Sequence, residues 1–219
     1  MMRSKSRSVL FAVAAMAAAS CGVDPAVEVG TAQQAVLAPD VRFAEVHYDN
    51  TGTDTGEAIE VSGPAGMDVT GWTVVLYNGN GGASYDTKTL TGAFPATCGT
   101  RGVFVINYPA NGIQNGGAGT ANDSPDAMAL VNAAGTVIEF LSYEGVFTAA
   151  NGAAAGQVST DIGVRELGNE PIGKSLQRSG AGTWSGPIDN TFGTCNDGDT
   201  TPPAEVATVT VAPASGVTL

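Results

Sequence analysis

Basic residues are few in this chain, and histidine is almost missing. Its 219 residues include nine lysines and arginines against 21 aspartates and glutamates, and its one histidine is His47. A zinc site of the usual histidine-rich kind is thereby excluded. A Ser-His-Asp set would depend on His47 alone, inside a predicted strand, so we expect a structural or surface histidine. The sequence predicts no enzyme and no cofactor.

Long hydrophobic runs are also missing. The apolar segment over residues 9–19 is eleven residues long, whereas crossing the hydrocarbon core of a membrane takes about 20. Arg3, Lys5 and Arg7 precede this segment and small residues follow it. This order is typical of an export signal, so residues 1–20 are predicted to be a signal peptide.

Helical periodicity is missing from the rest of the chain. After residue 20, no stretch keeps a 3.6-residue apolar period for three turns. The apolar runs are instead short, rich in β-branched and aromatic residues, and bounded by Gly, Asn, Asp or Pro, which indicates strands joined by turns. Nine strands are predicted, at 41–48, 58–62, 71–77, 85–90, 102–108, 127–131, 136–143, 162–167 and 173–178. The expected fold is all-β, an immunoglobulin-like antiparallel β-sandwich.

The chain has three cysteines, and the first one directly follows the predicted signal peptide. The run Ala18-Ala19-Ser20-Cys21 resembles the lipobox of bacterial lipoproteins, which implies that Cys21 is acylated. The protein is then expected at the bacterial cell surface or outer membrane, touching the membrane only through its lipid. Ala17, Ala18 and Ala19 would also serve an ordinary signal peptidase, so plain secretion is the alternative. Cys98 and Cys195 are left to form a disulfide in an oxidising compartment.

The exported part is strongly acidic. Residues 1–20 carry three of the nine basic residues and none of the 21 acidic ones, so the remainder has a net charge of −15. Its six basic residues are scattered, whereas nucleic-acid binding needs clustered lysines and arginines. We expect no direct nucleic-acid binding by this stretch. An acidic surface keeps an exported protein soluble or collects divalent cations.

The chain divides into five parts. Residues 1–20 are the signal peptide, and residues 21–40 read as a flexible spacer after the anchoring cysteine. Residues 41–195 are the expected sandwich, long enough for a single core. Residues 196–204 read as a linker. Residues 205–219 read as one further strand, which cannot bury a core by itself.

Several motifs in the sandwich region resemble the bacterial extracellular form of the lamin tail domain. They include Phe43-Ala44-Glu45-Val46-His47-Tyr48-Asp49, Gly56-Glu57-Ala58-Ile59-Glu60-Val61, Asp68-Val69-Thr70-Gly71-Trp72, Asp126-Ala127-Met128-Ala129-Leu130-Val131 and Gly173-Lys174-Ser175-Leu176-Gln177-Arg178. The resemblance covers about residues 41–195. It implies an immunoglobulin-like sandwich with a binding or spacing role and no established catalysis. The expected partner is an unknown extracellular protein or glycan.

The last residues set up two functional hypotheses. The run Val206-Ala207-Thr208-Val209-Thr210-Val211 resembles the first strand of a group 2 bacterial Ig-like repeat. One hypothesis is a non-catalytic adhesion, binding or spacer module at the cell surface. Bacterial relatives of the lamin-tail type are often joined to such repeats and to secreted DNA/RNA endonucleases. The alternative is therefore an accessory domain of a nuclease whose catalytic domain lies beyond Leu219.

One segment matches a phosphate-binding pattern. Residues 168–175, Gly-Asn-Glu-Pro-Ile-Gly-Lys-Ser, fit a glycine followed by four residues and Gly-Lys-Ser. That pattern needs a helix after the loop, whose first amides hold phosphate. Here Gly180 follows Ser175 by five residues, so no helix is expected. The segment is predicted to be a turn that leads into a strand.

The remaining candidates are acidic. Glu57 and Glu60 are three positions apart on a predicted strand, so they point to opposite faces, whereas Glu45 and Glu60 can meet across neighbouring strands. A glycosidase would need such a pair inside a cleft. Oxygen-rich loops that could hold Ca²⁺ contain Asp49, Asn50 and Asp54, and Asn122, Asp123 and Asp126. Neither has EF-hand spacing, and turn formation by these side chains is the expected role.

Overall fold

The structure, a computed structural model, describes residues 40–116, 125–196 and 198. The predicted signal peptide, Cys21, most of the predicted spacer and the strand expected within 205–219 lie outside these residues. Within the described residues all regular elements are strands: β1 (Arg42–His47), β2 (Ala58–Pro64), β3 (Thr73–Asn78), β4 (Ala83–Thr89), β5 (Arg101–Asn107), β6 (Asp126–Val131), β7 (Val137–Tyr143), β8 (Thr160–Asp161), β9 (Lys174–Arg178) and β10 (Trp184–Asp189).

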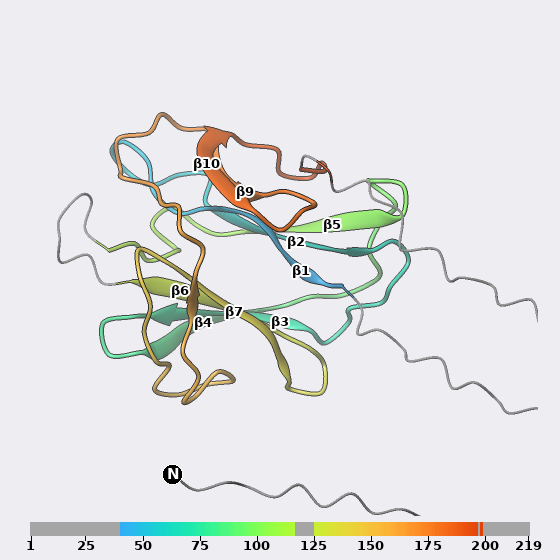
Figure 1. Cartoon of the computed structure of the whole chain (residues 1–219), viewed down its shortest axis with the longest axis horizontal. Helices are drawn as coiled ribbons and strands as arrows, with labels where there is room; N and C mark the ends of the chain where they lie inside the picture. The colour runs from blue at the N-terminus through green and yellow to red at the C-terminus, as the bar shows by residue number, and fades with distance from the viewer. Residues whose placement is uncertain (1–39, 117–124, 197, 199–219) are drawn as a thin grey trace, which may run out of the picture. The chain divides into compact units, whose positions relative to one another are not determined.

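The strands form two five-stranded sheets, which lie one above the other (Figure 1). The first sheet has the order β10-β9-β1-β2-β5 and the second has the order β4-β3-β6-β7-β8. Neighbouring strands are antiparallel, except that the short β8 is parallel to β7. The predicted immunoglobulin-like β-sandwich is confirmed.

The predicted strand over 162–167 is wrong. Only Thr160 and Asp161 pair with β7, and the chain then leaves the sheet. Gly163 has a φ of 77° and donates its amide to the Asp161 carboxylate, so the backbone turns where the sequence suggested a strand. Ile162 and Val164 still pack against the core. Ile162 also donates its amide to the backbone oxygen of Ser142 in β7, whereas Val164 belongs to no strand. The alternation of these residues therefore reflects packing against the core and not a continued strand.

Strand β10 was not predicted, because Gly186 and Pro187 lie within it and these residues usually break strands. In the structure β10 is an edge strand, and its register with β9 shifts between Ser185 and Ile188. The glycine and the proline lie inside this irregularity, where the proline need not donate an amide to the ladder.

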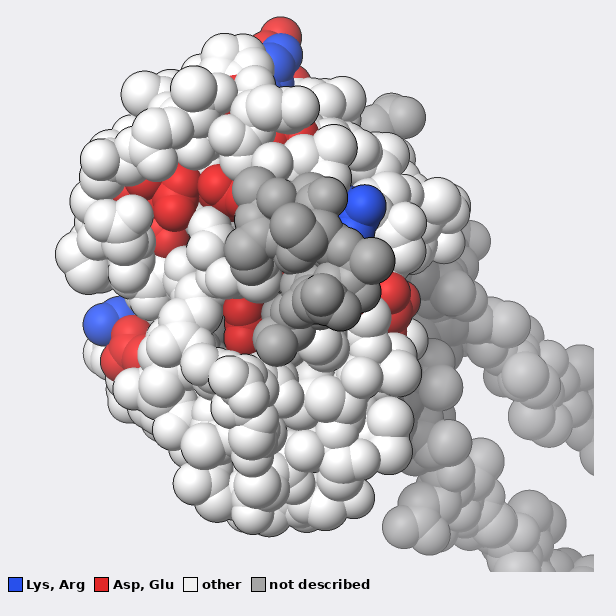
Figure 2. Space-filling view, turned by 90° about the vertical axis from the view of Figure 1, so that its left-hand side faces the viewer, with Lys and Arg blue, Asp and Glu red and all other residues white. Residues whose placement is uncertain are grey.

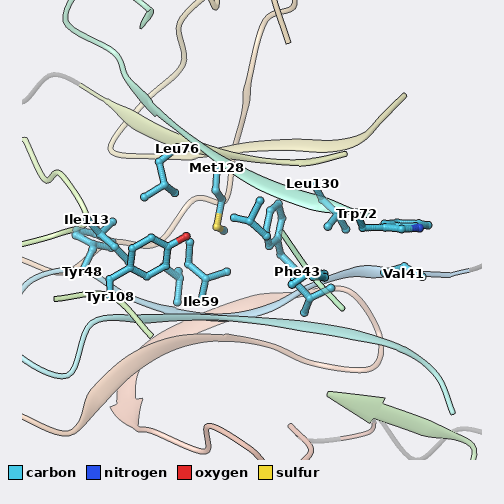
Figure 3. Packing of buried hydrophobic residues seen from close by; sticks show 14 of the residues in the cluster. Val41, Phe43, Tyr48, Ile59, Trp72, Leu76, Tyr108, Ile113, Met128 and Leu130 are labelled. Atoms are coloured by element: carbon cyan, nitrogen blue, oxygen red, sulfur yellow. The ribbon is translucent and has the colours of Figure 1, made fainter. Parts of the chain in front are cut away.

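The main core lies between the facing sheets. Leu76 and Met128 extend from the second sheet toward Ile59 and Phe43 of the first (Figure 3). As predicted, Trp72, Val74 and Leu76 share one face of the strand region around β3 and belong to this core. Residues of the opposite face, including Val75 and Tyr77, join a second cluster with Ala149 and Ala154 of the 144–159 loop. The outward face of the second sheet is therefore covered over β3, β6 and β7, whereas Ala83, Thr87 and Thr89 of β4 are exposed.

The outward face of the first sheet carries a polar row. Its polar members Gln177, Glu45 and Glu60 pair in register across β9, β1 and β2, and the apolar Val105 of β5 pairs with Glu60 at the end of the row. An extra residue, Ala44, interrupts the register of β1 and β2, so that Glu45 points outward although Phe43 and Val46 are core residues. Glu45 and Glu60 are nevertheless fully buried. A segment that follows β10 covers this face.

The covering segment is residues 191–196, which we call the C-terminal clasp. Thr191 donates its amide and its hydroxyl to Glu45, and the amide of Gly193 donates to Glu60. Asn196 donates its side-chain amide to the backbone oxygens of Ala44 and Arg178. The predicted disulfide between Cys98 and Cys195 is confirmed, with 5.8 Å between the two Cα atoms. It ties the clasp to the start of β5, because Cys98 pairs with Arg101.

Candidate functional site

Buried carboxyl groups are the unusual feature of this sandwich, since Asp and Glu are seldom fully buried unless they are paired. Among the described residues six are buried: Glu45, Asp49, Glu57, Glu60, Asp126 and Glu166. Most of them accept hydrogen bonds from the backbone of a distant loop. The densest group lies where β1 ends, around His47, and this is the candidate site.

His47 and Glu166 form a buried pair at the centre of the site. The Nδ1 atom of His47 lies 2.8 Å from Oε1 of Glu166, and the two side chains are 1% and 0% exposed. The second oxygen of Glu166 accepts the backbone amides of Tyr48 and Asp49, at 2.7 and 2.9 Å. The amide of Glu166 in turn donates to the Tyr48 hydroxyl. Glu166 thereby fixes the residues that follow β1.

The other ring nitrogen of His47 also faces only acceptors. Its Nε2 atom lies 3.3 Å from Oδ1 of Asn50 and 3.2 Å from the backbone oxygen of Thr55. Asn50 is oriented by donating its amide nitrogen to Thr51 and Thr53 and by accepting the amide of Thr55. Both ring nitrogens are therefore placed to donate, an arrangement that stabilises the imidazolium form of His47.

The electrostatics agree with this assignment. Burial acts to lower the pKa of His47, but the hydrogen bond and negative charge of Glu166 outweigh it and raise the pKa above its usual value. A protonated imidazole with both N–H groups engaged cannot accept a proton. His47 is therefore unsuited to the general-base role that a Ser-His-Asp set would require, and the geometry gives it a structural role.

Asp49 and Asp54 lie beside this pair. Burial, the charge of Asp54 and a hydrogen bond with Asp54 raise the pKa of Asp49 to about 7. The Asp54 carboxylate also accepts the amide of Asn50 and the side-chain amide of Asn115. The site thus holds a carboxyl group that changes its protonation state near neutral pH.

These contacts bear on the predicted calcium loops. The first loop uses Asn50 and Asp54 to close its own turn, as turn-forming side chains do. In the second loop Asn122 and Asp123 lie outside the described residues, and Asp126 accepts the amide of Gly79. Across 40–116, 125–196 and 198, no group of three or more His, Cys, Asp or Glu side chains is placed to hold a metal ion.

The other acidic candidates are also engaged. Glu45 and Glu60 do meet across β1 and β2, but both are 0% exposed and accept donors from the clasp. Substrate has no access to them in this conformation. Glu57 precedes β2 and accepts the amides of Gly112 and Ile113, each at 2.8 Å. It fixes the loop after β5.

The segment that matches a phosphate-binding pattern is a turn followed by β9. Ile172 and Gly173 form the turn, and Lys174 begins the strand. The Lys174 ammonium group donates to Asp189 of β10 at 2.6 Å, and the Ser175 hydroxyl donates to the buried Glu45. The predicted turn into a strand is confirmed, and both polar side chains have structural partners.

Glu166 is the member of the site that the sequence did not reveal. It lies in the segment that was predicted to be a strand, 119 positions away from His47. No local spacing connects the two residues, because the fold alone brings the loop after β8 to the end of β1. A single histidine in an acidic chain predicts that some carboxylate pairs with it, but not which one.

The surface shows the same excess of acid. Several acidic side chains gather on the face in Figure 2, where basic side chains are few. Ion pairs within the described residues include Lys88 with Asp86, Arg101 with Asp40, Lys174 with Asp189 and Arg178 with Glu139. No helix among the described residues is long and apolar enough to cross a membrane.

Searches of known protein families, curated proteins and solved structures found no match to this chain. The fold and the site therefore define a class only: an immunoglobulin-like β-sandwich with buried carboxyl groups and one disulfide.

Proposed function

We propose that this chain is an exported, lipid-anchored surface protein whose sandwich is a non-catalytic binding, adhesion or spacer module of the lamin-tail type. The observation that carries the proposal is the disulfide between Cys98 and Cys195. Disulfides persist in oxidising compartments and are rare in the cytosol. This fits the export signal over residues 1–20 and the lipobox-like run that ends at Cys21.

The chemistry of the candidate site supports a non-catalytic role. His47 is held as an imidazolium, Glu166 and Glu57 accept backbone amides, and Glu45 is covered by the clasp. Each group is used to position a loop. We place the binding partner outside the cell, as a protein or glycan, because the scattered basic residues offer no nucleic-acid surface.

The experiment is metabolic labelling with a fatty-acid analogue, followed by membrane fractionation. The wild-type chain is expected to take up the label and fractionate with the envelope, and Cys21→Ser is expected to lose both properties. As a matched control, Cys98→Ser removes a different cysteine and should keep the label. An unlabelled mature chain that begins after Ala19 or Ser20 would contradict lipid anchoring and establish plain secretion.

The accessory role in a secreted DNA/RNA endonuclease is the second candidate. The observation in its favour is the alternating run from Val206 to Val211, which resembles the start of an Ig-like repeat. Reading the gene downstream of Leu219 separates the two candidates. An in-frame nuclease domain would establish the accessory role, and a stop codon would remove it.

A further inference from the structure

The C-terminal clasp is held by polar contacts. Its side-chain and backbone donors reach Glu45, Glu60 and the Ala44 oxygen at distances of 2.7 to 2.8 Å. Phe192, the one large apolar residue of the clasp, is only half-buried and belongs to neither core cluster of the described residues. Segments with little apolar burial open locally at low free-energy cost.

The surface beneath the clasp is suited to water. Gln177, Glu45 and Glu60 lie side by side on the outward face of the first sheet, and the apolar partners Leu176, Val46 and Ile59 point into the core. An antiparallel sheet with one polar and one apolar face is stable when the polar face is solvated. Removal of the clasp would therefore expose groups that water can satisfy, and it would leave the main core intact.

The disulfide is the covalent link that keeps the clasp near this face. Cys195 lies within the clasp, and Cys98 is fixed beside the first residue of β5. With the bond closed, residues 191–196 are confined to the outward face. With the bond open, the hydrogen bonds and the limited packing of the half-buried Phe192 are left to hold them.

We propose that the Cys98–Cys195 disulfide operates the clasp as a redox latch. Reduction releases residues 191–196 from the sheet, uncovers Glu45 and Glu60, and leaves the sandwich folded. Closing the latch removes two electrons and two protons from the two cysteine thiols, and an external disulfide accepts them to become two thiols. A dithiol reductant reverses the exchange.

Release would change the surface chemistry of the protein. Glu45 and Glu60 are paired directly across β1 and β2, where like charges are unfavourable. The closed clasp supplies donors to both carboxylates. The open latch presents the same two carboxylates to solvent as an acidic pair. The outward face of the first sheet is therefore covered in the oxidised protein and carries two exposed carboxylates in the reduced protein.

The test uses the full chain with Cys21→Ser, so that Cys98 and Cys195 are the remaining cysteines. Hydrogen exchange is measured with and without a phosphine reductant, together with carbodiimide labelling of carboxylates. On reduction we expect the amides of Thr191 and Gly193 to exchange about tenfold faster or more, while β1, β2, β3 and β6 keep their protection. Labelling of Glu45 should rise in the same samples.

Two variants make the test specific. The double variant Cys98→Ser with Cys195→Ser should show the hydrogen exchange and carboxylate labelling of the reduced protein. The reductant should change neither measurement. Thr191→Val removes the hydroxyl contacts to Glu45 and Asn196 but keeps the disulfide, so it should open the clasp less than reduction does. The proposal is overturned if reduction leaves the clasp protected, if all strands lose protection together, or if Thr191→Val opens it as far as reduction.

The latch rests on the proposed export, because a cytosolic chain would not keep this disulfide. The exchange measurement uses purified protein, so its failure would leave the lipid-labelling result untouched.

Discussion

At the scale of single residues, a buried pair of oppositely charged side chains stabilises the fold. His47 and Glu166 form a buried pair whose remaining hydrogen-bonding atoms are occupied by Asn50, Tyr48 and Asp49. A buried pair of this kind adds little over an apolar pair, but removing one partner leaves the other charged and unpaired. A variant that lacks one partner is therefore expected to be less stable than a variant in which neither charge is left.

His47→Ala should lower the free energy of unfolding by about 3 kcal/mol, because Glu166 would stay buried without its cation. His47→Ala combined with Glu166→Gln should recover part of that loss, since the second change removes the unpaired charge. Urea unfolding of the single and double variants measures both. If the free energy of unfolding of His47→Ala lies within about 0.5 kcal/mol of wild type, the pair does not stabilise the fold.

Asp49 predicts a pH dependence of stability. Its pKa is raised to about 7 in the folded state from 3.8, so the folded protein holds more protons than the unfolded chain between these values. Stability therefore falls as pH rises from about 4 to 7. The raised pKa of His47 acts in the same direction: its contribution is complete below about pH 6.5 and is lost as pH rises through the folded value.

The domain should accordingly be more stable at pH 5 than at pH 8, and Asp49→Asn should reduce that difference by roughly 1–3 kcal/mol. Thermal unfolding at the two pH values measures the effect. Asp68→Asn is the matched control, because Asp68 is exposed and its carboxylate has hydrogen bonds with the side chain and amide of the nearby Thr70, which lower its pKa below the range of the measurement. Greater stability at pH 8 than at pH 5 would contradict the assigned protonation states.

At the scale of elements, sequence patterns predicted the strands well where local chemistry decides the conformation. Alternation around Trp72, Val74 and Leu76 identified β3, because both faces of that strand pack into apolar clusters. The patterns failed at 162–167 and at β10. In the first case the ladder ends with the Ile162 amide and the following loop packs apolar residues against the core, and in the second an edge strand tolerates Gly186 and Pro187.

The candidate site was predictable only in part for the same reason. The register that brings Glu45 opposite Glu60 follows from two adjacent strands, so the sequence predicted that they can meet. Contacts such as Glu166 with His47 and Thr191 with Glu45 join segments more than 100 positions apart. No local period encodes them.

Glu57 offers a test of how the loops are held. Glu57→Ala should cost about 2–3 kcal/mol, because the amides of Gly112 and Ile113 lose their acceptor. Hydrogen exchange at these two amides should rise while the amides of β3 and β6 keep their protection. Asp68→Ala removes an exposed carboxylate whose hydrogen bonds are local, with the side chain and amide of Thr70, and should cost less than about 1 kcal/mol. Unchanged exchange at Gly112 in Glu57→Ala would show that the loop is held by other contacts.

At the scale of the whole molecule, one covalent link closes the domain. The disulfide joins residues 97 positions apart, and the chain-entropy relation gives up to about 4.7 kcal/mol for a loop of this length. Cys98→Ser with Cys195→Ser should lower the free energy of unfolding by up to that amount, as measured by urea unfolding. A loss below about 1 kcal/mol would indicate that the hydrogen bonds of the clasp hold it without the bond.

We propose that the mature protein is a lipid-anchored, disulfide-closed sandwich outside the cytoplasm. Mass spectrometry of the protein recovered from its native envelope under non-reducing conditions tests this claim most directly. We predict an acylated N-terminal peptide that begins at Cys21 and a linked pair of peptides that contains Cys98 and Cys195. An unmodified N-terminus together with free thiols at Cys98 and Cys195 would contradict it.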